Sequence, residues 1–420
     1  MPKQGTIPIS PTNSATAEIK NIISDISKQN EEPACINDHR ISMYESYVKE
    51  PLPSRVSHLW RYSDPKWFEL ENNRISINPV SISLNIAEDY VKKGIILAPI
   101  KDVFKLQEMR EQVKNTFSQQ IKKSPDKFSC LNDATWKTGY FLYVPKDVRV
   151  VEPLSISVNY SGSDELISTK ILIILDEGAD ISVIDDITSD AKASILVNLL
   201  SEVYLAENSK LTYLNFQTNG DGVIQHCIQR AELKKNAELT NLIVALGGKI
   251  SKTDIGVDLV GENATVSTYG IVLGDKSQKF DHHTTINHDA SHTNSTLNFR
   301  VALKDKSTSA YTGNLNIAHH AVKSDAIQEN RNLLLSESAK AESIPELEIL
   351  TNDVIRCSHG VTVGQVDKDQ IFYLMSRGLN QKEAERIIIE GFLEPTISRV
   401  PGDKLAEQIR QKVNKKLENL

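Results

Sequence analysis

The spacing of apolar residues divides the chain into three regions. Up to about residue 125, apolar residues recur at helical spacing, and proline-containing connections separate the segments. From 126 to 366, short β-branched runs such as LSISV, ILIIL and VSTYGIV alternate with Gly, Asn, Asp and Ser. Helical spacing returns from 367 to 420. The pattern predicts a mainly β core, 126–366, between an N-terminal helical region, 1–125, and a C-terminal helical region, 367–420.

A weak repeat in the β region indicates which β fold it forms. A polar turn with a small residue, followed by an alternating strand, recurs at intervals of 30, 28, 27, 43 and 32 residues. A unit near 30 residues is typical of stacked coils, each of which buries its inner face against its neighbours. A sandwich would show turns about every 8–12 residues without the longer period. We therefore predict a parallel β-helix, and the small residues of the repeat are Ala179, Ser209, Ala237, Ala264, Ser307 and Ala339.

Individual helices are predicted on both sides of the β core. One is expected from Val103 to Lys122, because its apolar residues mark one face. Asp367 can cap a helix after the core, and Asn380 with Glu383 resembles a capping box that begins another. A final charged helix carries a narrow apolar stripe that can dock onto its own domain or onto a partner. The stripe consists of Leu405, Ile409, Val413 and Leu417.

Composition and charge exclude several classes of protein. Hydrophobic residues make up 40% of the 420 residues and charged residues 25%, which excludes wholesale disorder. The formal net charge of -7 supplies no field that gathers phosphates, so nucleic acid is not expected as a partner. No apolar stretch approaches the roughly 20 residues that cross a bilayer, and the N-terminus lacks the apolar core of a secretory signal. A membrane is therefore not expected as a partner either.

The cysteines bear on the compartment. Cys35, Cys130, Cys227 and Cys357 are far apart and form no CxxC pair. This spacing disfavours both a disulfide framework and a compact thiolate zinc site. Together with the missing export signal, it predicts a protein of the reducing cytoplasm.

A histidine cluster is the first candidate for chemistry. His282, His283, His288 and His292 lie in DHHTTINHDASHTN, and imidazole is a common ligand of zinc, iron and copper. On an alternating strand, His282, His288 and His292 would share a face, which permits a metal site. The alternative is that the polar rungs of a β-helix simply carry these histidines without a metal.

Cys357 and His359, in RCSHG, are the second candidate. Two positions apart on a strand, the thiol and the imidazole project to the same side, where Arg356 and His359 can help to stabilise a thiolate. Sulfur and nitrogen together suit iron, zinc or persulfide chemistry. The structural alternative is that Cys357 is a free cysteine buried as a small hydrophobe.

Common enzyme signatures are missing, since the chain has no Walker lysine loop, no GxGxxG after a strand, no GxSxG elbow and no HExxH. We expect a non-catalytic scaffold, and any ATP-driven work would need an ATPase on another chain. Two alternatives stay open. A structural adaptor would have no ligand chemistry, whereas a carbohydrate-active β-helix enzyme would group acidic residues in one outer groove. The acidic candidates are Asp185, Asp186, Asp281 and Asp289.

From Asn314 to Arg377 the chain closely resembles the C-terminal signature of the SufB/SufD family of iron-sulfur cluster assembly proteins. The most specific pieces are QENRNLLLS, which contains Gln328 and Asn330, together with PELEI, CSHGVTVG and IFYLMSRG. Weaker similarity extends upstream through YVPKDVRVVEPLSI and LPSRVSHLWRYSD. The chain is most similar to the SufD branch, because CSHG and SRG are SufD-like, whereas SufB members typically carry a histidine-glutamate pair there.

The resemblance implies a right-handed parallel β-helix flanked by helical regions, and pairing through the β-helix core with a SufB-like subunit or with itself. It implies that the C-terminal helical region docks SufC, an ABC-type ATPase. Cys357 and His359 would lie near the subunit junction as candidate iron ligands, where iron or a nascent cluster is held transiently without an intrinsic cofactor. Whether a reduced flavin binds the complex stays open. Candidate contacts to the ATPase are Phe372, Tyr373, Arg377, Ile388 and Phe392.

Overall fold

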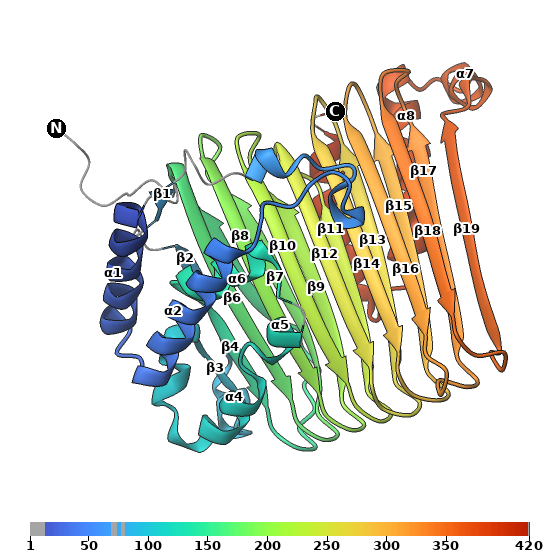
Figure 1. Cartoon of the computed structure of the whole chain (residues 1–420). Coiled ribbons are helices and arrows are strands. Elements are labelled where there is room, and N and C mark those ends of the chain that lie inside the picture. The colour runs from blue at the N-terminus through green and yellow to red at the C-terminus, as the bar shows by residue number, and fades with distance from the viewer. Residues whose placement is uncertain (1–12, 69–73, 77–79, 124, 419) are drawn as a thin grey trace.

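The computed structural model describes residues 13–68, 74–76, 80–123, 125–418 and 420 (Figure 1). The first 12 residues, on which part of the expectation about export rests, lie outside the described residues. Of the helices within the described ranges, none combines the length and the apolar character that crossing a membrane requires.

A parallel β-solenoid forms the middle of the chain, which confirms the predicted fold class (Figure 1). Successive strands alternate between two sheets, so that β8 pairs with β6 and β10, and β9 pairs with β7 and β11, always in parallel. The inward side chains of all coils fill one continuous apolar core. The strands are β4 Thr138–Val144, β5 Leu154–Tyr160, β6 Ser163–Leu175, β7 Asp180–Ser189, β8 Ser194–Leu205, β9 Lys210–Thr218, β10 Ile224–Leu233, β11 Glu238–Ala245, β12 Ile250–Leu259, β13 Thr265–Gly274, β14 Lys279–His288, β15 Asn294–Leu303, β16 Thr308–Ile317, β17 Asp325–Leu334, β18 Lys340–Ile349 and β19 Arg356–Gln365.

The small residues of the sequence repeat mark the entries to strands. Each of them is buried and immediately precedes a strand. The intervals near 30 residues separate strands of the same sheet, and therefore measure one coil. The 43-residue interval runs from the start of β13 in one sheet to the start of β16 in the other, which is one and a half coils.

Most of the N-terminal region covers the first coils of the solenoid, whereas the segment around η1 lies over later coils (Figure 1), where His58 is 3.0 Å from Glu346 of β18. Strands β2 and β3 pair antiparallel with β5 and β4, and so end both sheets. The buried Trp60, Phe68 and Phe128 pack with residues of β8 and β10 on the outer face of one sheet. The elements of this region are α1 Asn13–Gln29, α2 Ala34–Lys49, η1 His58–Trp60, η2 Pro65–Phe68, β1 Arg74–Ile75, β2 Ser81–Leu84, α3 Glu88–Lys92, β3 Ile96–Pro99, η3 Ile100–Lys105, η4 Gln107–Met109, α4 Arg110–Thr116, α5 Gln119–Lys123 and α6 Lys127–Thr135.

The single helix predicted from Val103 to Lys122 is wrong. The segment contains the end of the 3-10 helix η3, the 3-10 helix η4 and the short α-helices α4 and α5. Ser118, with a φ of 58°, separates α4 from α5. The backbone N–H groups of Ser118 and Gln120 donate to the buried Glu202 carboxylate over 2.8 and 3.1 Å. An external acceptor thus replaces the carbonyl groups that a continuous helix would supply, and apolar spacing does not reveal such an acceptor.

Buried ion pairs also tie the N-terminal region to the solenoid. The fully buried Lys170 ammonium on β6 contacts the Asp133 carboxylate on α6 and lies 3.2 Å from the Glu202 carboxylate on β8. Lys252 on β12 donates to the Leu59 carbonyl over 2.7 Å.

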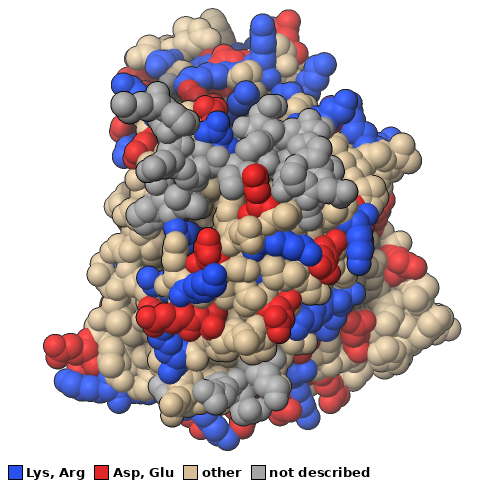
Figure 2. Space-filling model, turned by 60° about the vertical axis from the view of Figure 1, so that its left-hand side comes forward, with Lys and Arg blue, Asp and Glu red and all other residues tan. Residues whose placement is uncertain are grey.

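At the surface, acidic and basic side chains are intermixed over this end of the molecule (Figure 2). One exposed pair is Lys20 and Glu45, whose side chains are 2.6 Å apart.

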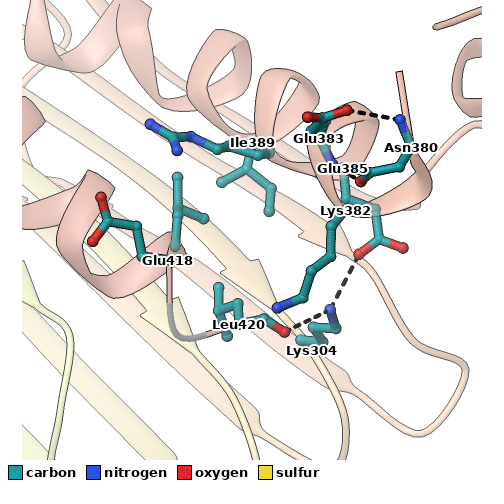
Figure 3. A pocket seen from close by; sticks show the side chains of 10 residues that line it. Lys304, Asn380, Lys382, Glu383, Glu385, Ile389, Glu418 and Leu420 are labelled. Atoms are coloured by element: carbon teal, nitrogen blue, oxygen red, sulfur yellow. Dashed lines mark hydrogen bonds and ion pairs between the residues drawn. The ribbon is translucent and has the colours of Figure 1, made fainter. Parts of the chain in front are cut away.

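The C-terminal region folds into α7 Lys368–Ser376, α8 Gln381–Ile397 and α9 Asp403–Leu417. The predicted capping box is confirmed, because the Glu383 N–H donates to Asn380 Oδ1 over 3.0 Å and the Asn380 N–H donates to Glu383 Oε2 over 2.8 Å. The apolar stripe of α9 packs, with α8, on the outer face of the sheet that contains β9, β11 and β13. Lys304, just after β15, donates to Glu385 over 3.1 Å and to the Leu420 carbonyl over 3.2 Å (Figure 3), so both helices are held against their own solenoid.

Candidate functional site at the open end of the solenoid

The C-terminal end of the solenoid is uncovered. β18 and β19 are the last strands of the two sheets, and β19 is the outermost strand in Figure 1. Among the described residues, no strand pairs with the outer edge of either. Uncovered strand edges are templates for another chain, and solenoids usually carry a cap at each end. The antiparallel strands β2 and β3 provide such a cap only at the other end.

Apolar side chains at this end are also exposed. They belong to β18, to the turn that follows it and to β19. Exposed apolar side chains that gather in one place mark an interaction surface. They are Ile349, Leu350, Ile355 and Val363, between 41% and 64% exposed.

Cys357 and His359 lie on β19, on the face directed toward the core. Cys357 is half-buried and packs against the core of the solenoid, whereas His359 is exposed because no further coil covers it. In the preceding coil, Ala326 lies in register with Cys357 and Gln328 with His359. The strand therefore places one thiol and one imidazole side by side at the open end.

The expectation that Arg356 stabilises a thiolate at Cys357 is wrong for this chain. The Arg356 guanidinium is on the opposite face of β19 and donates two hydrogen bonds of 2.9 Å to Asp325. Burial raises the pKa of the Cys357 thiol, so the chain by itself holds the thiol in its protonated form.

Two amide side chains below the site were overlooked as functional residues in the sequence. In the sequence, Gln328 and Asn330 were recognised only as part of the family signature, yet both side chains are fully buried on the inward face of β17. Neither amide atom of Gln328 has a hydrogen-bond partner among the described residues, nor has Nδ2 of Asn330. Two polar residues at alternate positions of a strand in the core were the signal that could have revealed them.

The histidine cluster forms no metal site. His282 and His288 point into the core, and the His288 ring nitrogens lie 2.7 and 2.8 Å from Thr293 and Ser295 hydroxyls. His283 points to the outer face, whereas His292 is exposed in a turn with a φ of 59°. Across the described ranges, no group of three His, Cys, Asp or Glu side chains is arranged to hold a metal ion.

The five candidate contacts for an ATPase divide into two sets. Phe372 and Tyr373 on α7 are 73% and 56% exposed, and the Arg377 guanidinium lies 5.1 Å from the Tyr373 ring centre. Ile388 and Phe392 on α8 are only partly exposed. The Phe392 ring packs on the solenoid of the same chain. The backbone carbonyl of Phe392 accepts a 2.5 Å hydrogen bond from an arginine of β15.

The acidic residues considered for a carbohydrate-active enzyme do not share a groove. Asp185 is in the core, where it accepts hydrogen bonds from Tyr140 and Tyr213, and burial raises its pKa to about 7. Asp186 on the outer face is paired with a lysine of α9, and Asp281 is buried beneath the N-terminal region, where Ser63 donates a hydrogen bond to it. Asp289 is exposed in the turn after β14.

A groove of about 450 Å³ lies on the outer face of β10, β12, β14, β16 and β18. His58 and Leu59 form part of its wall, and among the described residues Leu59 is the one large apolar side chain that lines it. Flavin rings are bound mainly by apolar and aromatic surfaces. The lining of this groove does not suit a flavin ring.

The chain is thus a parallel β-solenoid with one uncovered end. A family model described as "SUF system FeS cluster assembly, SufBD core domain" matches residues 158–392, more than half of the chain. The chain therefore belongs to the SufBD family of iron-sulfur cluster assembly proteins. Similar curated proteins from Staphylococcus saprophyticus, Staphylococcus epidermidis and Staphylococcus aureus are described as iron-sulfur cluster assembly SufBD family proteins. Each is 26% identical over 427 residues, which cover 93% of this chain and 91% of the relative.

Proposed function

We propose that this chain is a SufD-like scaffold subunit that holds iron or a nascent iron-sulfur cluster at a junction with a sister subunit. The single observation that carries the proposal is the uncovered end of the solenoid, which presents Cys357 and His359 together. The cluster is cargo rather than a resident cofactor, and the chain itself catalyses no reaction.

The partner at the open end is a SufB-like β-solenoid, or a second copy of this chain when that subunit is missing. Its terminal strands would continue the sheets of β18 and β19 by backbone hydrogen bonds, and its apolar side chains would cover Ile355 and Val363. This arrangement encloses Cys357 and His359 within the junction. The chain works in the cytoplasm, without nucleic acid or membrane as a partner.

The chemistry at the junction needs a nitrogen and a sulfur ligand. Neutral imidazole binds iron through one ring nitrogen. The Cys357 thiol must lose its proton before its sulfur binds, and a bound metal ion removes that proton because it stabilises the thiolate. Cargo binding and thiol deprotonation are thus coupled at this site.

A SufC-like ATPase docks on the C-terminal helical region. The exposed Phe372 and Tyr373 on α7 supply the aromatic anchors that protein interfaces favour. Closure of two ATPase subunits would pull on α7 and α8 and shift the paired solenoids, which opens the junction to iron and sulfur. Ile388 and Phe392 stay predictions for a second contact.

Replacing His359 by alanine is expected to lower cluster formation at least 10-fold, because one of the two proposed ligands is lost. The measurement is anaerobic reconstitution of the purified complex with ferrous iron and sulfide, followed by visible absorption and Mössbauer spectroscopy. His319→Ala, which changes an exposed histidine outside β19, is the matched control. Unchanged cluster formation in an assembled His359→Ala complex would falsify the proposed role, and would leave a structural adaptor.

Replacing both Phe372 and Tyr373 by alanine is expected to weaken ATPase binding by about 30-fold or more, which corresponds to about 2 kcal/mol for a lost aromatic anchor. Calorimetry with the purified SufC-like ATPase measures this affinity. The melting temperature should not fall, since both side chains are exposed. Val151→Ala removes a 93% exposed apolar side chain elsewhere and should bind normally. Equal affinity of the double variant and the control would exclude α7 as the docking element.

A further inference from the structure

Gln328 lies directly beneath His359 in the solenoid. The two residues are register partners on the parallel strands β17 and β19, so both project from the same face. Neighbouring strands are about 4.8 Å apart, and side chains in register across that spacing are within contact distance. The imidazole of His359 is therefore the polar group stacked immediately above Gln328.

The amide of Gln328 is buried without a partner. Its side chain is 0% exposed, and neither its oxygen nor its nitrogen forms a hydrogen bond with a described residue. The amide extends across the core toward Gly313, where a Cβ atom would lie only 2.1 Å from its nitrogen. A buried unsatisfied polar group costs about 1–3 kcal/mol, so a native structure that retains one calls for an explanation.

Two polar groups near Gln328 already have hydrogen-bond partners of their own. The Tyr311 hydroxyl lies 3.0 Å from the Thr284 hydroxyl. The Asn330 side-chain oxygen accepts a 2.6 Å hydrogen bond from Asn332. The Ser343 hydroxyl also has no hydrogen-bond partner among the described residues, but Ser343 lies on the opposite sheet, where its register partner is Tyr311. His359 has no hydrogen bond to any described residue, and so its ring is the open partner in the next coil.

We propose that Gln328 is the positioning residue of His359. Its amide oxygen accepts a hydrogen bond from one ring N–H when a partner subunit covers the open end. That bond fixes the tautomer, and leaves the lone pair of the other ring nitrogen directed toward the junction. The proposal rests on the proposed function for the partner subunit that covers the open end and for the identity of the ligand, which is iron.

An amide suits this position better than a carboxylate. It accepts a hydrogen bond without bringing a charge into a core that is otherwise largely apolar. A glutamate in its place would retain the acceptor but would carry a desolvation penalty. Gln328→Glu therefore tests the acceptor, and Gln328→Leu removes it at similar size.

The test reads the His359 tautomer from the ring nitrogen chemical shifts of ¹⁵N-histidine-labelled full-length protein, paired with its unlabelled SufB-like subunit at pH 8. The wild-type protein should show one dominant tautomer, Gln328→Leu a mixture of two, and Gln328→Glu one again. Gln229→Leu, at another buried core glutamine on β10, is the matched control and should match the wild type. An unchanged tautomer ratio in Gln328→Leu overturns the proposal.

Two further readouts separate positioning from structure and from the proposed function. Ferrous iron should bind the Gln328→Leu complex about 10–100-fold more weakly, as for other residues that orient a metal ligand. The melting temperature of the Gln328→Leu chain without its partner subunit should not fall, because the replaced amide has no hydrogen-bond partner in the single chain as described. A lower melting temperature with an unchanged tautomer would make Gln328 structural. If His359→Ala forms clusters normally, the proposed function fails, whereas the tautomer experiment still decides the hydrogen bond.

Discussion

Replacing Lys170 by methionine is expected to destabilise the protein by about 3–5 kcal/mol, because it leaves buried carboxylates without their cation. Burial alone would raise the pKa of Asp133, but the charge of Lys170 and the hydrogen bonds of His39 and Lys170 hold that pKa well below its usual value. The Glu202 carboxylate also loses its neighbour 3.2 Å away. Urea denaturation at pH 7 measures the change as a lower midpoint.

The control for Lys170 is an exposed pair. Lys20→Ala removes the surface contact with Glu45 and should change the free energy of unfolding by no more than about 1 kcal/mol. A triple variant, Lys170→Met with Asp133→Asn and Glu202→Gln, should recover part of the loss, since no unpaired charge then remains in the interior. If Lys170→Met unfolds like Lys20→Ala, the buried ion pairs do not hold the N-terminal region in place.

Acidification from pH 7 to pH 4.5 is expected to destabilise the fold by about 4 kcal/mol. Burial lowers the pKa of His226 to about 3 and the pKa values of His282 and His288 to about 4. Below pH 6.5 the unfolded chain binds these protons and the folded chain does not, so stability present above pH 6.5 is lost as the pH falls. Asp185 acts in the opposite direction, because burial raises its pKa to about 7 and the folded state takes up a proton first. The stabilisation from Asp185 offsets the destabilisation that roughly one of the three histidines causes.

His226 provides the sharpest test of this pH dependence. Neither of its ring nitrogens has a hydrogen-bond partner among the described residues, and its ring packs against Trp60, Phe68 and Phe128. His226→Leu should therefore be nearly neutral at pH 7, and should lose about 2–3 kcal/mol less than the wild type on going to pH 4.5. His319→Gln, at an exposed histidine, should follow the wild-type curve. Identical curves for His226→Leu and the wild type would contradict the assignment.

The two ends of the solenoid differ in how their strand edges and polar groups are paired. At the N-terminal end, antiparallel strands and buried ion pairs satisfy the backbone edges and the charges within one chain. At the C-terminal end, the strand edges, the exposed apolar side chains and the Gln328 amide have no partner within the described residues. Mutations at the N-terminal end are therefore expected to change the stability of the single chain, whereas mutations at the C-terminal end are expected to change assembly.

Local sequence features predicted much of the fold. The turn-and-strand repeat indicated a β-helix because each coil reuses the same small buried residue before a strand, as at Ala179 and Ala237. The Asn380 and Glu383 pair predicted the start of α8, since a capping box involves only four consecutive residues. The helix expected from Val103 to Lys122 failed because its interruption depends on Glu202, which is distant in sequence.

Residues near one another in the chain were enough to predict the solenoid, the helices around it and the alternation that places Cys357 and His359 on one face of a strand. The coordinates were needed to show that this strand is the uncovered last one, that Arg356 turns away from the thiol, and that Gln328 lies beneath the imidazole. Those features arise from the stacking of coils about 30 residues apart, and a pairing between coils leaves no local pattern to read.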